Sequence, residues 1–153
     1  MRRSAAKKAM GARSLTPDES PGFLLWRVNL SWQRAMVGAL RPLGLTHVQF
    51  VLLASAWWLT RVAGETPSQR RLAEHAATDP MMTSQVLRVL ESRGFVTRAA
   101  DPSDSRALRL AVTERGARLA QEAVRVVEAA DAEFFKAAGD RGSVLRLLRR
   151  LAG

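Results

Sequence analysis

Apolar positions recur with helical spacing along most of the chain, and four stretches show this pattern clearly: residues 21–41, 46–62, 114–138 and 143–151. The first begins with Ser20 and Pro21, a cap followed by a proline at the first helical position, and ends before Pro42. The stretch 46–62 opens on a capping box and is apolar on nearly all sides, which predicts a buried central helix. The pattern therefore predicts a mainly helical fold.

Two shorter helices are predicted in the middle of the chain. The segment 66–69, Thr-Pro-Ser-Gln, has the composition of a capping box with proline at the first helical position, and a short helix follows it. Thr78 and Asp79 form a tight break, after which Asp79 and Pro80 begin a helix that ends at Arg93. A short helix, a tight turn and a second helix with polar residues near its start are typical of a helix-turn-helix.

A β-hairpin is predicted directly after these helices. Gly94 can take the left-handed conformation that closes a helix, and the β-prone segment 95–98 follows. The segment 101–104, Asp-Pro-Ser-Asp, has turn composition. Side chains alternate over 107–112, with Leu108, Leu110 and Val112 on one face, and Thr113 then stands at the N-cap of the next helix. Helix, turn, helix and two-stranded wing together indicate a winged helix-turn-helix.

This order divides the chain into four segments: a flexible basic arm (1–19), an N-terminal dimerisation helix (20–45), the winged helix-turn-helix domain (46–113) and C-terminal dimerisation helices (114–153). The terminal helices are not part of a minimal winged helix, and their apolar stripes need burial. Pairing with the same helices of a second copy would cover them, whereas the alternative is that they pack on their own winged helix. Since helix-turn-helix proteins commonly bind two half-sites as a twofold pair, we expect a homodimer.

Composition and charge narrow the function. The 153 residues carry a net charge of +10, which favours a polyanionic partner such as nucleic acid over mere solubility. With no cysteine, disulfides and thiolate metal sites are excluded, and His47 and His75 are too few for a metal site. We find no transmembrane run, secretory signal, catalytic pairing or phosphate loop. We therefore expect a cytoplasmic protein that is not an enzyme and has no cofactor and no membrane partner.

In four stretches the chain resembles the MarR family of bacterial transcriptional regulators: LTHVQFVLL (45–53), QRRLAEHA (69–76), MMTSQVLRVLESRGFVTR (81–98) and DPSDSRALRLAVTERG (101–116). Asp104 and Arg106, followed by alternating apolar residues and Thr113-x-x-Gly116, match the family's wing signature. The resemblance covers Pro21 to the C-terminus. It implies a triangular homodimer in which the terminal helices form the dimer layer and each subunit contributes one winged helix. Such proteins usually repress nearby genes, and many release DNA when a small, often aromatic ligand binds between the layers.

The resemblance also implies which residues bind DNA. In this family the second helix of the motif enters the major groove, which assigns that role to Met82, Thr83, Ser84, Gln85 and Arg88. Ser84 and Gln85 can form hydrogen bonds to base edges, and Arg88 can pair with a phosphate or a guanine. The alternative for this set is an ordinary solvated helix face.

Arg106 is placed by the resemblance at the wing tip, where it would reach a narrow A·T-rich minor groove. Asp104 is expected to orient nearby Arg side chains, since phosphates repel a carboxylate. The alternative is a purely local Asp–Arg turn contact. Arg98 and Arg109 are candidates for backbone contacts or for a solvated surface.

Five aromatic side chains on the first two long helices are candidates for a ligand pocket, because the family's pocket usually lies there: Trp26, His47, Phe50, Trp57 and Trp58. The alternative is that they belong to the core, since Trp at helical spacing commonly does. His47 directly follows a cap residue and could serve only that helix start.

The predicted function is sequence-specific binding of double-stranded DNA by a homodimeric regulator, most simply a repressor that acts on a pseudo-palindromic operator and is released by a small effector. Two alternatives stay open at this point: a ligand-independent DNA-binding regulator, and a winged-helix protein-interaction module that does not bind DNA.

Overall fold

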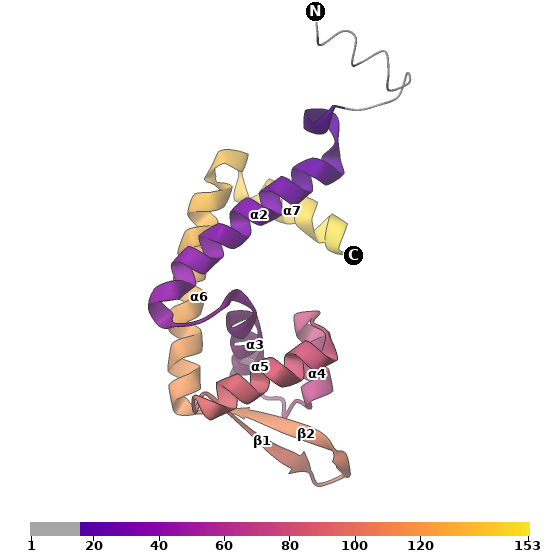
Figure 1. Cartoon of the computed structure of the whole chain (residues 1–153), viewed down its shortest axis with the longest axis vertical. Coiled ribbons are helices and arrows are strands. Elements are labelled where there is room, and N and C mark those ends of the chain that lie inside the picture. The colour runs from indigo at the N-terminus through magenta and orange to yellow at the C-terminus, as the bar shows by residue number, and fades with distance from the viewer. Residues whose placement is uncertain (1–15) are drawn as a thin grey trace, which may run out of the picture. The chain divides into compact units, whose positions relative to one another are not determined.

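The computed structural model of the chain describes residues 16–153 (Figure 1). Most of the predicted basic arm, residues 1–15, lies outside the described residues. The helices are α2 (Pro21–Leu40), α3 (His47–Trp57), α4 (Gln69–Ala76), α5 (Pro80–Ser92), α6 (Glu114–Phe134) and α7 (Arg141–Ala152). Strands β1 (Val96–Asp101) and β2 (Asp104–Val112) form one antiparallel hairpin. The predicted fold, mainly helical with a small hairpin, is confirmed.

Shorter elements join these helices. Three 3-10 turns are present in the described chain, η1 (Pro17–Glu19), η2 (Arg41–Leu43) and η4 (Phe135–Ala138), and α3 continues into a π-helical turn, η3 (Trp58–Val62). The chain divides into two compact units, one ending at Arg34 and the other covering Ala35–Gly153. In the first unit, Glu19 accepts hydrogen bonds from the backbone amide (3.0 Å) and hydroxyl (2.9 Å) of Thr16. Residues 17–19, predicted to belong to an arm without regular structure, thus form one 3-10 turn.

The core of the second unit is built around α3, as its all-round apolar character predicts. Leu52, Leu53, Ala56 and Leu59 are fully buried in α3 and η3. Helices α4, α5 and α6 and strand β2 all pack against α3. They contribute further buried apolar side chains, among them Leu72, Leu87, Leu90, Leu110 and Ala120. The central helix therefore fixes both helices of the helix-turn-helix relative to the wing.

Most helix starts follow the capping signals in the sequence, with one exception. The Thr46 hydroxyl accepts from the Gln49 amide (3.2 Å), and the Gln49 side chain accepts from the Thr46 amide (3.1 Å), so this capping box is confirmed. The second predicted box is wrong by two residues, because the Arg71 amide donates to the hydroxyl of Ser68 (3.0 Å), which caps α4.

Pro67 and Ser68, which precede α4, pair instead with the wing. The amide of Leu110 donates to the carbonyl oxygen of Pro67 (2.9 Å), and Ser68 forms an antiparallel bridge with Arg109. The wing therefore has a short third segment at its base, contributed by the residues before the first helix of the motif. An isolated two-stranded hairpin is marginally stable in water, so this addition stabilises the wing.

Candidate nucleic-acid interface

Helix α5 is the predicted recognition helix, and its start is fixed by Asp79 and Pro80. One carboxylate oxygen of Asp79 accepts hydrogen bonds from the amides of Met81 and Met82, both at 2.9 Å. Pro80 stands at the first helical position, where no amide is needed. These caps satisfy free amides at the helix start and so stabilise the first turn of α5, next to which polar side chains are displayed.

The two sides of α5 differ as the apolar spacing predicts. Leu87 and Leu90 are fully buried against the core. On the other side Gln85 and Arg88 are exposed, Ser84 is half-buried, and Met81 and Met82 are 72% and 38% exposed. A run of polar and flexible apolar side chains thus faces away from the core.

Thr83 is placed differently from the sequence-based expectation. Its side chain is fully buried, and its hydroxyl donates to the Asp79 carbonyl oxygen (2.8 Å) and lies 2.8 Å from the hydroxyl of Thr78. These bonds tie α5 to the turn that precedes it. The expectation that Thr83 contacts DNA is therefore corrected: its position in the turn leaves no polar atom free toward solvent.

At the wing, the residue that orients an arginine side chain is Asp101 rather than Asp104. Asp101 accepts from the Arg109 Nε (2.8 Å) and from the amide (2.8 Å) and hydroxyl (2.7 Å) of Ser103. The Arg109 guanidinium, helped by the Ser103 bonds, holds the pKa of Asp101 well below its usual range. One carboxylate thus joins the two strands and closes the turn.

Asp104 has a local role. It accepts from the backbone amide of Arg106 (3.0 Å) and so shapes the start of β2. The Arg106 side chain is exposed at the wing tip, as predicted. Local sequence could not show that Asp101 faces Arg109, because that contact depends on how the two strands pair, with Ala99 opposite Arg109.

Arg98 lies at the base of the wing, not at its tip. Its side chain is only 13% exposed and pairs with Glu91 of α5, with Nη2 and Oε2 2.6 Å apart. The sequence made Arg98 a candidate for a contact to the DNA backbone or for a solvated surface; the structure instead places it among the groups that join the wing to the helix-turn-helix.

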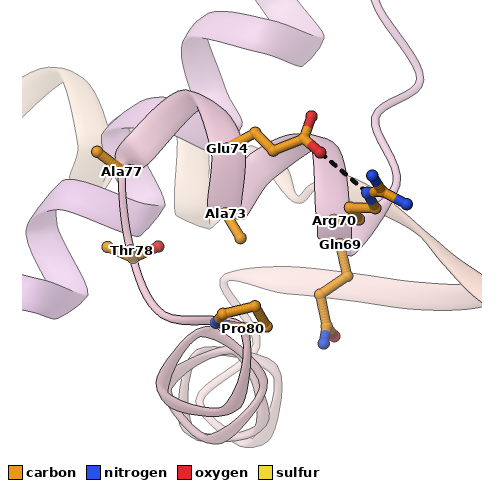
Figure 2. A pocket seen from close by; sticks show the side chains of 7 residues that line it. All are labelled: Gln69, Arg70, Ala73, Glu74, Ala77, Thr78 and Pro80. Atoms are coloured by element: carbon orange, nitrogen blue, oxygen red, sulfur yellow. Dashed lines mark hydrogen bonds and ion pairs between the residues drawn. The ribbon is translucent and has the colours of Figure 1, made fainter.

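The first turn of α4 separates two surface pockets, and sequence analysis did not single out the residues that form it. One pocket, of about 470 Å³, lies between α4 and the start of α5 and is lined by Gln69, Arg70, Ala73, Glu74, Ala77, Thr78 and Pro80 (Figure 2). The other, of about 450 Å³, faces the wing tip, where Asp104 and Arg106 line it. Gln69 and Arg70 line both pockets, and Arg70 pairs with Glu74 at 2.9 Å. Arg70 therefore adds a positively charged side chain to the candidate interface, between the recognition helix and the wing.

Among the candidates for the ligand pocket, His47, Phe50 and Trp58 belong to two separate ring pairs. The rings of His47 and Phe50 stack with centroids 6.4 Å apart, and Trp58 stacks on His75 of α4 at 5.4 Å. Burial lowers the pKa of His47, although Asp131 acts in the opposite direction. Trp57 is half-buried at the end of α3, while Trp26 lies on the part of α2 that belongs to the first unit.

Within residues 16–153, no helix taken by itself combines the length and the apolar composition needed to span a membrane. Only the bent pair Pro21–Leu43 and His47–Val62, taken together, has the length and apolar composition of a span.

Comparison with known proteins agrees with this geometry. The sequence model of the MarR family matches residues 45–108. The HTH-type transcriptional regulator YdcH of Bacillus subtilis is 44% identical over 135 residues, which are 88% of this chain and 91% of YdcH.

Two similar solved structures carry bound molecules. CouR from Rhodococcus jostii, solved with p-coumaroyl-CoA, is 32% identical and has a TM-score of 0.75 over 91% of this chain and 93% of its own. The Mycobacterium tuberculosis MarR family protein Rv2887, solved in complex with DNA, is 33% identical, with a TM-score of 0.68 over 88% of this chain and 98% of its own. Because the similarity to YdcH extends over most of both chains and the winged helix-turn-helix agrees with it, this chain belongs to the MarR family of transcriptional regulators.

Proposed function

We propose that this protein is a homodimeric repressor that binds a pseudo-palindromic DNA operator and releases it when a small aromatic effector binds. The observation that carries the proposal is the geometry of α5 and the wing. The polar face of α5 and Arg106 are both exposed, α5 packs against β1, β1 pairs with the strand that carries Arg106, and the chain has a net charge of +10. The complex of Rv2887 with DNA supports the same mode of action.

In this proposal α5 enters the major groove and the wing enters the minor groove. Gln85 and Ser84 read base edges, Arg88 pairs with a guanine or a phosphate, and Met82 contacts a thymine methyl group. Arg106 inserts into the adjacent minor groove, where its guanidinium is attracted by the negative potential of an A·T tract. Thr83 is left out because it is buried.

Arg70 is proposed as a further contact to the DNA backbone. It is highly exposed, with its side chain 88% accessible, and it lies on the helix turn between the recognition helix and the wing. Such contacts fix the register of a protein on the duplex without reading its sequence.

The homodimer is supported by unburied apolar side chains on the last helix. Leu147 and Leu151 of α7 are 56% and 69% exposed, and Leu145 and Leu148 of the same helix are also exposed. A contiguous apolar helix face of this kind marks an interaction surface, and a second copy covers it by symmetry.

An effector is supported by the aromatic side chains around α3 and by the relative CouR, whose bound p-coumaroyl-CoA carries an aromatic acyl group. We propose His47, Phe50, Trp57 and Trp58, which all lie on α3 and η3, as residues that contact it. The protein then acts in the cytoplasm, by binding alone and without a catalytic step. Titration with p-coumaroyl-CoA, followed by tryptophan fluorescence and by release of labelled duplex, tests this class of ligand.

The experiment that tests DNA binding is a salt titration by fluorescence anisotropy, with duplexes that the protein selects from a random-sequence pool. We expect dimer binding with a steep negative slope of affinity against salt. The variant Arg106→Ala should lose about 1–3 kcal/mol of binding free energy. Arg125→Ala on α6 is the matched control for charge, because it removes one exposed positive charge outside the helix-turn-helix and the wing; since α6 belongs to the predicted dimerisation helices, sedimentation verifies that this variant is still a dimer. If no duplex is selected or bound at low salt, the DNA-binding function is refuted in favour of a protein-interaction module.

A further inference from the structure

Arg98 is a side chain that contacts all three parts of the DNA-binding motif, α4, α5 and the wing. It lies on β1, at the base of the wing, opposite Leu110 in the strand register. Its Nε and Nη2 donate to one carboxylate oxygen of Glu91 in the last turn of α5, at 3.0 and 2.6 Å. Its backbone amide donates to the other oxygen at 3.2 Å. Nη1 lies 3.5 Å from the side-chain oxygen of Gln69, the first residue of α4.

This guanidinium is poorly placed for direct contact with DNA. Only 13% of the Arg98 side chain is exposed, against 36% for Glu91. The hydrogen bonds from Arg98 also lower the pKa of Glu91, so the carboxylate stays charged and keeps the pair intact. Charge-assisted bonds with two donors on one carboxylate hold a fixed geometry better than a single contact does.

The position of Arg98 gives it leverage on the wing tip. Arg106 lies four residues along β2 from Leu110, the partner of Arg98, and a strand rises about 3.3 Å per residue, so the tip is about 13 Å from this joint. A tilt of about 10° at the joint therefore moves the tip by roughly 2 Å. A binding constellation tolerates displacements of only about 0.5 Å, so the orientation of the wing decides whether Arg106 reaches its groove.

We propose that Arg98 is a positioning residue for DNA recognition: by tying β1 to Glu91 of α5 and to Gln69 of α4, it fixes the wing so that Arg106 reaches the minor groove while α5 occupies the major groove. This inference rests on the proposed DNA-binding function. Arg98 and Glu91 then change the affinity for DNA indirectly, by determining where Arg106 lies.

A double-mutant cycle on the full-length protein tests the proposal. Arg98→Met keeps the length and apolar stem of the side chain and removes the guanidinium, and it is measured alone and combined with Arg106→Ala. The probe is a duplex that the wild-type protein selects from a random-sequence pool. Alone, Arg98→Met should weaken binding by about fivefold to a hundredfold, the range expected for losing an Arg contact to a base. In the Arg106→Ala background the same change should have less than about a twofold effect.

A second variant, Glu91→Ala, distinguishes a positioning role of Arg98 from direct contact with DNA, because the two predict opposite changes in affinity. If Arg98 itself contacted DNA, removing Glu91 would free the guanidinium and raise the affinity. If Arg98 positions the wing, Glu91→Ala lowers the affinity as Arg98→Met does, and only while Arg106 is present. Replacing A·T pairs by G·C pairs at the wing contact should weaken wild-type binding but leave binding by either variant nearly unchanged, an effect that general loss of stability does not produce.

The outcomes separate the two proposals. Equal losses from Arg98→Met in both backgrounds, or tighter binding by Glu91→Ala, would overturn the positioning role while DNA binding itself stands. Failure of the wild-type protein to select or bind any duplex would instead refute the proposed function. Circular dichroism and the thermal midpoint of each variant show whether it is folded, and if Arg98→Met is unfolded at the assay temperature, Glu91→Ala decides the question.

Discussion

Replacing Gly116 by alanine should destabilise the protein strongly, although alanine is the better helix former. Gly116 lies in the first turn of α6, and a Cβ built there would be 2.0 Å from the carbonyl oxygen of Phe95 and 2.8 Å from its carbonyl carbon. Both neighbours are backbone atoms, so no side-chain rotation relieves the clash. Accommodating the methyl group requires α6 to move away from Phe95, in the segment that joins α5 to β1.

The magnitude follows from the contacts that this movement breaks. The Thr113 amide donates to the Phe95 carbonyl oxygen at 3.1 Å, and the Thr113 hydroxyl donates to that of Gly94 at 2.8 Å. Loss of one or two such bonds costs about 1 kcal/mol each, and overpacking costs about 1–3 kcal/mol. The gain in helix propensity returns about 1 kcal/mol. We therefore expect a net loss of about 1–4 kcal/mol, or roughly 2–15 °C in Tm for a domain of this size.

Thermal unfolding followed by circular dichroism measures this loss, with all variants at the same protomer concentration, because a dimer's Tm depends on concentration. Gly38→Ala is the matched control, since a Cβ at Gly38 of α2 meets nothing within 4 Å and should be neutral or slightly stabilising. If Gly116→Ala unfolds within about 1 °C of the wild type, the close approach of α6 to Phe95 does not exist in solution and the steric reasoning is wrong.

Three further predictions concern the turn of the helix-turn-helix and the histidines. Thr83→Val should cost about 1–3 kcal/mol in urea unfolding, because it removes the buried hydroxyl that joins α5 to its preceding turn, whereas Ser84→Ala should change stability much less. Ala77 has a φ of 51°, so Ala77→Gly should relieve about 1–2 kcal/mol of left-handed strain against an entropic cost of about 0.4–1 kcal/mol, and a lower Tm in a thermal melt would contradict this. The folded-state pKa of His47 lies below its ordinary 6.5, so its neutral form stabilises the fold above that pH and the contribution is lost as pH falls below it. Melts between pH 7.5 and 5.5 should therefore show a smaller pH dependence for His47→Gln than for the wild type.

Local signals in the sequence were sufficient to predict much of the fold. Thr46, Asp79 and Thr113 each cap a helix through a bond to an amide two or three residues ahead, so their roles follow from neighbouring residues alone. The exposed face of α5 and the exposed Arg106 follow in the same way from periodicity and turn composition.

The sequence-based predictions that were wrong concern residues whose positions are determined by tertiary contacts. Thr66 has the composition of a cap, but Pro67 is drawn into pairing with β2, and the cap moves to Ser68. Thr83 follows the exposed Met82, yet its short side chain turns inward to the preceding turn. Arg98 has the charge of a DNA contact, but only the folded chain brings it to a glutamate seven residues earlier.

The pairing of Pro67 and Ser68 with the wing also bears on self-association. Exposed strand edges present unpaired amides and carbonyls that template aggregation. At Arg109 and Leu110, β2 has a backbone partner on each side, β1 on one and the segment before α4 on the other. Nearer the tip its edge carries Asp104 and Arg106, charges of the kind that discourage strand addition. A hairpin that must project from the protein to meet a second molecule is thereby kept from adding to the hairpin of a neighbouring copy.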